Sequence, residues 1–199
     1  SLHDALPIYP DAIVEYSDLV LSSSDYPAYF PQEFDLDYDA TAKLLVVDYK
    51  LPAPDDLPRL KAVKFVPSRE EFEEQNISDA QAQKLYDDTL YQITLRTIHE
   101  LFEANKIAAL TAVVMNGIVT ALDRTTGKHV TACVLSLHAR RDEFMAINLE
   151  YVDPKACFKS LKGVGSSKLH GLAAVAPIIQ LNRKDRKSTR LNSSHLYDL

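Results

Sequence analysis

The sequence predicts an α+β fold in which a mainly antiparallel sheet packs on one long helix, with the elements in the order ββαββαα. Three observations predict this fold. Residues 79–104 repeat apolar side chains every three to four positions, which is the period of a helix. Two pairs of short runs rich in β-branched and aromatic residues lie in the chain, one pair before this segment and one pair after it. Strands grouped around a single long helix are typical of an α+β domain.

The first pair of expected strands lies at 43–51 and 61–66. Leu, Val and Tyr side chains dominate the first run, and Pro52 ends it. A proline-rich turn then leads into the second run, whose side chains alternate between two faces. We expect both strands to belong to the main sheet.

The long helix has a recognisable start. Ser78 followed by Gln81 three residues later forms a capping box, a common signal for a helix N-terminus. The apolar repeat continues to Asn105, so the helix should contain roughly 26 residues and measure about 40 Å at 1.5 Å per residue. Its apolar stripe must be buried against the sheet.

The second pair of expected strands, 111–122 and 128–138, completes the sheet. Their connecting loop ends in Gly127, which can supply the left-handed residue of a hairpin. A short helix is expected at about 142–149. Another should begin with Asp153 as its cap and Pro154 at its first position, and end before Gly163.

The domain organisation is bounded by both ends of the chain. Residues 1–8 and 185–195 match the in-frame translations of sequencing-library adapters, so we expect 1–8 and 185–199 to be adapter-derived and to take no part in the fold. Residues 9–40 are rich in Asp, Ser, Tyr and Pro, a composition that predicts a poorly ordered linker. A single α+β domain is expected at 41–184, and the natural termini of the parent protein should lie outside this sequence.

The charge of the chain is unevenly distributed. The formal net charge is −6, but residues 9–103 hold 8 basic and 20 acidic side chains whereas residues 104–184 hold 11 and 5. A basic region is the usual footprint of a polyanionic partner, and an acidic region can cover it or repel misplaced phosphates. The alternative is that both regions are ordinary solvated surfaces of an acidic protein.

Membrane, disulfide and metal sites are not expected. No apolar run approaches the roughly 20 residues that a membrane span requires. Cys133 and Cys157 have neither CxxC spacing nor a zinc-like histidine pattern, so we expect free thiols in a reducing cytosol. His129 and His138 are nine residues apart on one expected strand, which would place them on opposite faces.

The sharpest local signal is the segment 161–170, Leu-Lys-Gly-Val-Gly-Ser-Ser-Lys-Leu-His. It resembles the hairpin of helix-hairpin-helix DNA-binding motifs, in which glycines let backbone amides approach a phosphate closely. Lys162 and Lys168 would flank that phosphate, and a neighbouring serine could donate a hydrogen bond to it. A plain structural turn is the alternative.

Asp48 and Lys50 form a second candidate pattern. They match the Asp/Glu-x-Lys half of metal-dependent nucleases, in which a carboxylate holds Mg²⁺ and a lysine assists the attacking water. Such a site needs a second carboxylate at the end of a neighbouring strand, and the sequence offers no evident partner. Ordinary surface residues are therefore favoured here, and no catalytic or metal-binding residue is predicted.

Three stretches carry a resemblance to a known family: Val-Asp-Tyr-Lys-Leu-Pro at 47–52, the helical segment 85–101, and the segment 152–170. Together they resemble the region that precedes the catalytic domain in Mrr-like bacterial restriction endonucleases. The resemblance implies a parent enzyme that cleaves DNA at a Mg²⁺-dependent PD-(D/E)xK site. It also implies that this site lies in a domain further downstream, so no cofactor is expected in the present chain.

By this resemblance the visible domain would be non-catalytic and would position or regulate the nuclease on DNA. The expected free thiols indicate a cytoplasmic location. The candidate phosphate contacts are Lys155, Lys159, Lys162, Gly163, Gly165, Ser166, Ser167, Lys168 and His170, with Arg140 and Arg141 as a second cluster. The alternative is a protein-interaction or assembly domain without DNA contact, and a homo-oligomer is one form that such an assembly could take. A third hypothesis makes the chain itself a hydrolase through Asp48 and Lys50.

Overall fold

The computed structural model of the 199-residue chain describes residues 9–105 and 108–182. The segments expected to be adapter-derived, 1–8 and 185–199, lie outside the described residues, as do residues 183–184 at the end of the expected domain. The helices are α1 (Pro10–Ser22), α2 (Asp79–Ala104), α3 (Arg141–Met145) and α4 (Pro154–Ser160), with short 3₁₀ turns η1 (Pro54–Asp56), η2 (Leu149–Tyr151) and η3 (Leu169–Gly171). The strands are β1 (Phe34–Asp39), β2 (Leu44–Leu51), β3 (Leu60–Val66), β4 (Glu71–Asn76), β5 (Ala112–Asp123), β6 (Lys128–Arg140) and β7 (Val164–Gly165).

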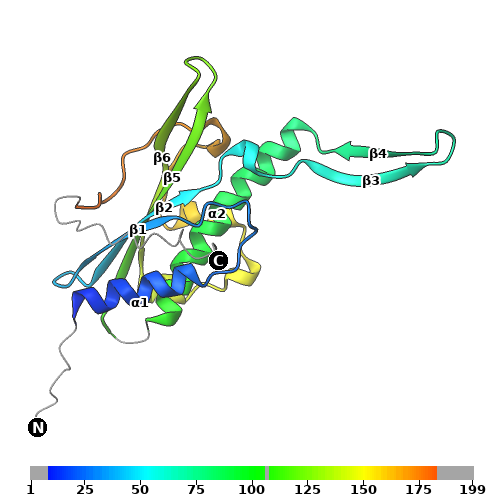
Figure 1. Cartoon of the computed structure of the whole chain (residues 1–199). Helices are drawn as coiled ribbons and strands as arrows, with labels where there is room; N and C mark the ends of the chain where they lie inside the picture. Colours follow the sequence, from blue (N-terminus) through cyan, green and yellow to red (C-terminus); the bar gives the residue numbers. More distant parts are fainter. Residues whose placement is uncertain (1–8, 106–107, 183–199) are drawn as a thin grey trace, which may run out of the picture.

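The main sheet has five strands in the order β1-β2-β5-β6-β7. Only β2 and β5 run parallel, and α2 makes the crossover between them (Figure 1). The pairs β1/β2, β5/β6 and β6/β7 are antiparallel. The predicted α+β class with a mainly antiparallel sheet is therefore confirmed.

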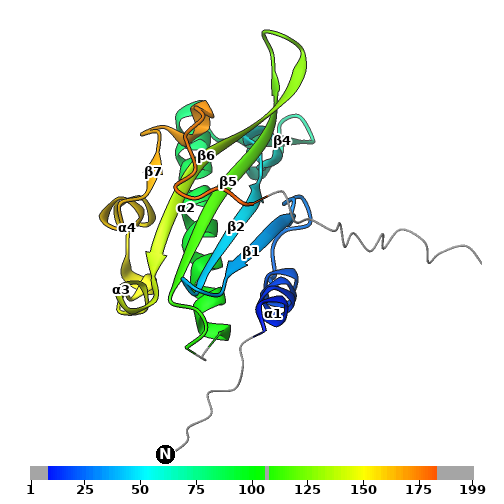
Figure 2. The ribbon, with the colours of Figure 1, turned by 90° about the vertical axis from the view of Figure 1, so that its left-hand side faces the viewer.

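One face of the sheet packs on α2 and forms the main core (Figure 2). Alternate residues of β2, such as Val47 and Tyr49, point to this face and meet buried residues of α2, such as Leu90 and Ile98. Apolar side chains at every second residue of the strand share one face, and apolar side chains at every third or fourth residue of the helix share one side. These two apolar surfaces pack against each other. We call the opposite side of the sheet the second face.

The start of α2 agrees with the capping box predicted from the sequence. Ser78 Oγ accepts a hydrogen bond from the backbone N–H of Gln81 at 3.2 Å, and Gln81 Oε1 accepts one from the backbone N–H of Ser78 at 3.0 Å. The helix has 26 residues and Asn105 is its C-cap, as predicted.

The prediction of a poorly ordered linker at residues 9–40 is wrong. This segment contains α1 and β1, and Leu21 of α1 is buried in the main core. The apolar residues of β1 alternate strictly with its acids, and this period of two sends Leu36 and Tyr38 toward the core while the acids face away. The acid-rich composition concealed that alternation, so the domain begins about thirty residues before the expected boundary at 41.

The strand expected at 61–66 exists, but it does not join the main sheet. It pairs with β4 in a separate antiparallel hairpin that projects from the body of the protein (Figure 1). Its partner β4 consists of polar residues apart from Phe72, and three of them are glutamates, so the sequence does not reveal a strand there. Phe65 and Phe72 face each other on this arm with ring centroids 5.3 Å apart, and both remain largely exposed.

The elements after β6 follow the prediction in part. Asp153 caps α4 by accepting a hydrogen bond from Ala156 N at 2.8 Å, and Pro154 occupies the first turn, as predicted. The helix expected at 142–149 is shorter, because α3 ends at Met145 and a separate 3₁₀ turn follows. In addition, residues 172–182, which we call the strap, cross the second face without regular structure (Figure 2).

Candidate functional site

Two carboxylates come together on the second face because of the register between β1 and β2. Asp35 and Asp48 are direct partners across these antiparallel strands. Their neighbours Phe34 and Tyr49 stack on the core side, so both carboxylates point to the second face. Side chains at directly opposite positions have Cβ atoms about 5 Å apart. Asp35 is exposed and Asp48 is half-buried.

Lys50 lies two residues beyond Asp48 and therefore points to the same face. Its ammonium group is 3.3 Å from Glu33 Oε2, and its backbone N–H donates to the carbonyl oxygen of Glu33 at 2.8 Å. The side chain is 37% exposed, so the ammonium group can meet a molecule bound at the surface. Two carboxylates and one lysine thus share one patch at the β1/β2 side of the sheet.

A row of buried polar side chains continues from Asp48 across the sheet. Asn116 on β5 is the register partner of Asp48, and Ser136 on β6 is the register partner of Asn116. Asn116 Nδ2 donates to Asp48 Oδ1 at 2.9 Å, and Ser136 Oγ donates to Asn116 Oδ1 at 2.7 Å. Both Asn116 and Ser136 are fully buried.

The strap covers this row. Its backbone is bonded to the sheet from Val175 N to Cys133 O at 2.8 Å and from Ile178 N to Ser136 Oγ at 2.9 Å. Asn116 Nδ2 also donates to the carbonyl oxygen of Ile179 at 2.9 Å. Leu181 then packs with Val46 and Val114 in a small apolar cluster on the second face. The strap therefore shields Asn116 and Ser136 from water.

The second carboxylate that the sequence did not reveal is thus Asp35. It was hidden because its segment was assigned to a linker, and because cross-strand register is not visible in a sequence. The alternation of acids with apolar residues at 34–39 was the signal that could have located it. No group of three or more His, Cys, Asp or Glu side chains suited to a metal ion occurs in residues 9–105 and 108–182. The candidate site therefore offers a pair of carboxylates and a lysine.

The predicted phosphate-binding segment has a different arrangement from a helix-hairpin-helix motif. After Gly163 the chain forms only the short strand β7 and the three-residue turn η3. Several of its amides already donate within the protein: Lys162 N to Lys159 O, Gly163 N to Phe158 O, Lys168 N to Ser166 Oγ, and His170 N to Asp87 Oδ1. Gly165 pairs with Leu135 in the sheet. This arrangement favours the structural-turn alternative.

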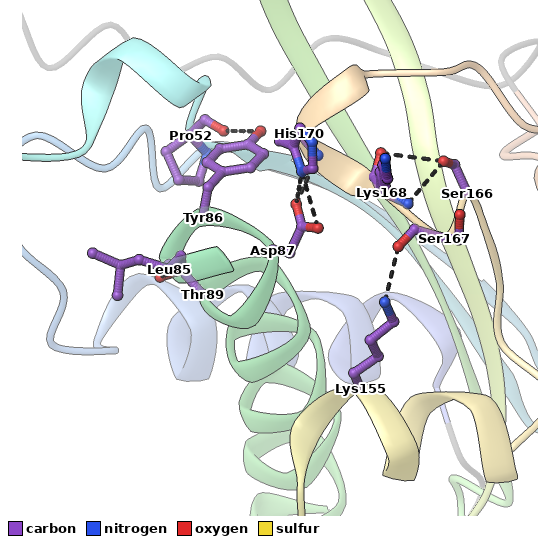
Figure 3. A network of polar contacts seen from close by, with 10 residues as sticks. All are labelled: Pro52, Leu85, Tyr86, Asp87, Thr89, Lys155, Ser166, Ser167, Lys168 and His170. Atoms are coloured by element: carbon purple, nitrogen blue, oxygen red, sulfur yellow. Dashed lines mark hydrogen bonds and ion pairs between the residues drawn. The ribbon is translucent and has the colours of Figure 1, made fainter. Parts of the chain in front are cut away.

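Lysine side chains nevertheless gather at this edge of the sheet. Lys159, Lys162 and Lys168 are exposed, whereas the ammonium group of Lys155 donates to the carbonyl oxygen of Ser167 at 2.9 Å (Figure 3). Ser167 is itself exposed. Because β6 and β7 lie at the opposite edge of the sheet from β1, these lysines lie apart from the carboxylate pair.

His170 attaches η3 to the long helix. Its Nδ1 lies 3.1 Å from both carboxylate oxygens of Asp87, and its backbone N–H donates to the same side chain at 2.7 Å (Figure 3). Both side chains are largely buried, with 21% and 12% exposure. His170 therefore has a structural partner and is not a simple surface contact for phosphate.

The two arginines of the second cluster differ from each other. Arg140 is exposed and lies 3.7 Å from Asp142. Arg141 donates to the carbonyl oxygens of Leu110 and Asn105, and its guanidinium lies over the Phe102 ring. Arg141 thus fastens the end of α2 to the sheet, and only Arg140 remains available at the surface.

The cysteines and histidines add no metal site among the described residues. Both cysteines are free thiols, as predicted, and burial raises the pKa of Cys133 to about 11. The expectation that His129 and His138 lie on opposite faces is wrong, because Val134 is an extra residue in a β-bulge of β6 and restores a common face. They remain nine residues apart along the strand, too far to share a metal ion.

No helix in residues 9–105 and 108–182 combines the length and apolar character needed to span a bilayer. Comparisons with protein-family models, with curated proteins and with solved structures find no match to this chain.

Proposed function

We propose that this chain is a divalent-cation-dependent phosphodiester hydrolase of the nuclease type, with Asp35, Asp48 and Lys50 as its active site. The observation that carries the proposal is the register of β1 and β2, which sets Asp35 directly opposite Asp48 with Lys50 two residues further along the same face. Asp48 and Lys50 alone are a common pair of surface residues. The facing carboxylate completes the residue set that this chemistry requires.

The residues fit a hard cation such as Mg²⁺. This ion keeps several water ligands and is usually bound through one or two carboxylates together with substrate phosphates. A pair of carboxylates can therefore suffice, even though no larger ligand cluster occurs in the described part of the chain. Bound Mg²⁺ would polarise a phosphoryl oxygen and lower the pKa of a coordinated water molecule.

The surrounding charges support the same role. Two acids at directly opposite positions of β1 and β2 place carboxylate oxygens, the ligands that Mg²⁺ prefers, on one side of the sheet. Lys50 is oriented by Glu33 at 3.3 Å and stands beside the pair on the face where a phosphate would approach. Its ammonium group would assist the attacking water and stabilise the negative charge that develops on the phosphate.

DNA is the substrate class that we propose. The resemblance to Mrr-like restriction endonucleases implies DNA as the substrate of a parent enzyme, although it assigns catalysis to a domain further downstream. The excess of basic residues in 104–184 also fits a polyanion such as DNA. Lys159, Lys162 and Lys168 would then hold the phosphate backbone at the β6/β7 edge, away from the carboxylates. A reducing cytosol fits the two free thiols.

A second candidate function is DNA positioning without catalysis, as the family resemblance implies. It is favoured by the exposure of the same three lysines and does not need the carboxylate pair. Binding to duplex DNA in EDTA, measured across a salt series, would support it if affinity falls steeply with salt and if no cleavage follows when Mg²⁺ is added.

The experiment that separates the two functions is a cleavage assay on supercoiled plasmid DNA with Mg²⁺ or Mn²⁺. We expect the wild-type chain to cleave, and Asp48→Asn to lower the rate at least about a hundredfold, since charge stabilisation by a metal ion is worth several kcal/mol. Lys50→Ala should lower it by about a hundredfold or more, the usual effect of losing a proton-transfer group. Absence of cation-dependent cleavage by the wild-type chain would contradict the proposal.

A further inference from the structure

Asp48, Asn116 and Ser136 form a hydrogen-bond relay in which each donor and each acceptor is identified by its neighbours. Ser136 Oγ accepts the backbone N–H of Ile178 at 2.9 Å, so its own proton is available for Asn116 Oδ1 at 2.7 Å. Because the Asn116 oxygen accepts that proton, its amide nitrogen must face Asp48 and the Ile179 carbonyl. This arrangement fixes the amide orientation of Asn116 without ambiguity.

Every polar atom of the two buried side chains is used in this relay. The amide of Asn116 has two N–H groups, and each meets an acceptor at 2.9 Å, one on Asp48 and one on the strap. Both side chains are fully buried, where a lost partner is costly because water cannot replace it. The relay therefore has one arrangement of donors and acceptors, and its last hydrogen bond holds one carboxylate oxygen of Asp48 in place.

We propose that Asn116 and Ser136 are positioning residues for the Asp48 carboxylate, and that the backbone of Ile178 and Ile179 forms the outer end of the relay. The inference rests on the proposed function, in which Asp48 holds a divalent cation. Residues that orient a ligating carboxylate through a hydrogen bond raise the affinity for the metal ion without touching it. The position of the strap on the sheet therefore influences, through Asn116 and Ser136, the orientation of the Asp48 carboxylate.

A purely structural network is the competing explanation, and it makes a different prediction. Breaking a structural network would lower thermal stability but would leave the orientation of Asp48 and its affinity for a cation unchanged in the folded protein. A positioning network changes both. Thr120 on β5 provides a matched control, because it lies on the second face and its Oγ1 is 2.8 Å from Thr131 Oγ1, outside the relay.

The test uses the full 199-residue chain and the variants Ser136→Ala, Asn116→Leu and Thr120→Val, each shown to be folded by circular dichroism. The first readout needs no metal: the ¹³Cγ resonance of Asp48 should shift in Ser136→Ala and in Asn116→Leu but not in Thr120→Val. The second readout is Mn²⁺ binding by calorimetry, which should weaken about tenfold to a hundredfold in the two relay variants.

The outcomes separate this inference from the proposed function. If the Asp48 resonance is unmoved in Ser136→Ala, the positioning role is overturned, whether or not the protein binds Mn²⁺. If the resonance shifts and Mn²⁺ affinity is equal in wild type and Ser136→Ala, the role is also overturned. If both change as expected but no phosphodiester is cleaved, the relay stands and the proposed hydrolase activity fails. Ser136→Ala removes a single oxygen, so it keeps the test valid even if Asn116→Leu does not fold.

Discussion

Gly163 illustrates how the structure changes the interpretation of a sequence signal. In the sequence this glycine suggested a close approach of the backbone to a phosphate. In the structure it makes room for Phe158 instead. A Cβ atom added at Gly163 would lie 2.5 Å from Cε1 and Cζ of the Phe158 ring and 2.7 Å from Cδ1. Real Cβ atoms essentially never approach another heavy atom so closely.

The Phe158 ring has little freedom to move away. It is 2% exposed and packs against Tyr91 with ring centroids 5.1 Å apart. Gly163→Ala must therefore shift a rigid aromatic ring or the backbone, and overpacking of this kind costs about 1–3 kcal/mol. For a chain of this size each kcal/mol lowers the melting temperature by about 2–4 °C, so the expected loss is roughly 2–12 °C.

The matched control is Gly171→Ala, because nothing lies within 4 Å of a Cβ atom added there. That variant should be neutral or stabilised by up to about 1 kcal/mol, since alanine restricts the unfolded chain. Thermal unfolding followed by circular dichroism compares the two variants directly. Equal melting temperatures would refute the packing argument, and an unchanged melting temperature with loss of DNA affinity would restore the phosphate-binding interpretation of Gly163.

Two further predictions concern the chain after α4 and the thiol of Cys133. Lys162 directly follows Leu161, the C-cap of α4, and has a left-handed φ of 63°, a conformation that glycine adopts without strain. Lys162→Gly should therefore raise the free energy of unfolding by about 1 kcal/mol in urea titrations, and a decrease would contradict this explanation of the helix end. Burial raises the pKa of the Cys133 thiol to about 11 from an ordinary value of 9.0, so less thiolate forms at pH 8 in the folded chain than in the unfolded chain. Alkylation of Cys133 by iodoacetamide in a Cys157→Ala background should therefore be slow in buffer at pH 8 and increase as the pH approaches 11. At pH 8 it should be much faster in guanidinium chloride, and equal rates in buffer and in guanidinium chloride would contradict a buried Cys133 thiol.

The sequence was most informative where the signal was local. The capping box at Ser78 and the apolar repeat after it depend only on neighbouring residues, and α2 begins and ends as predicted. The Asp153 cap of α4 is of the same kind. The hairpin of β3 and β4 was harder to predict from the sequence. The alternation of residues in a strand does not indicate which sheet the strand joins.

The candidate site was only half visible for the same reason. Asp48 and Lys50 form a pattern within one strand, so the sequence could indicate them. Asp35 becomes their partner only through the register of β1 with β2, which depends on the whole sheet. Asn116 and Ser136 have the appearance of ordinary polar residues in a strand, and their role depends on a strap that comes from more than forty residues further along the chain.

In the proposed function, the facing pair Asp35 and Asp48 binds the cation that supports hydrolysis. The most direct measurement compares Mg²⁺-dependent cleavage of plasmid DNA by Asp35→Asn and Asp37→Asn. Both acids lie on β1 and face the same side, but Asp37 is opposite Val46 instead of a second carboxylate. Asp35→Asn should lose at least about a hundredfold in rate while Asp37→Asn stays close to wild type. Equal activity of the two variants would contradict cation binding by the pair.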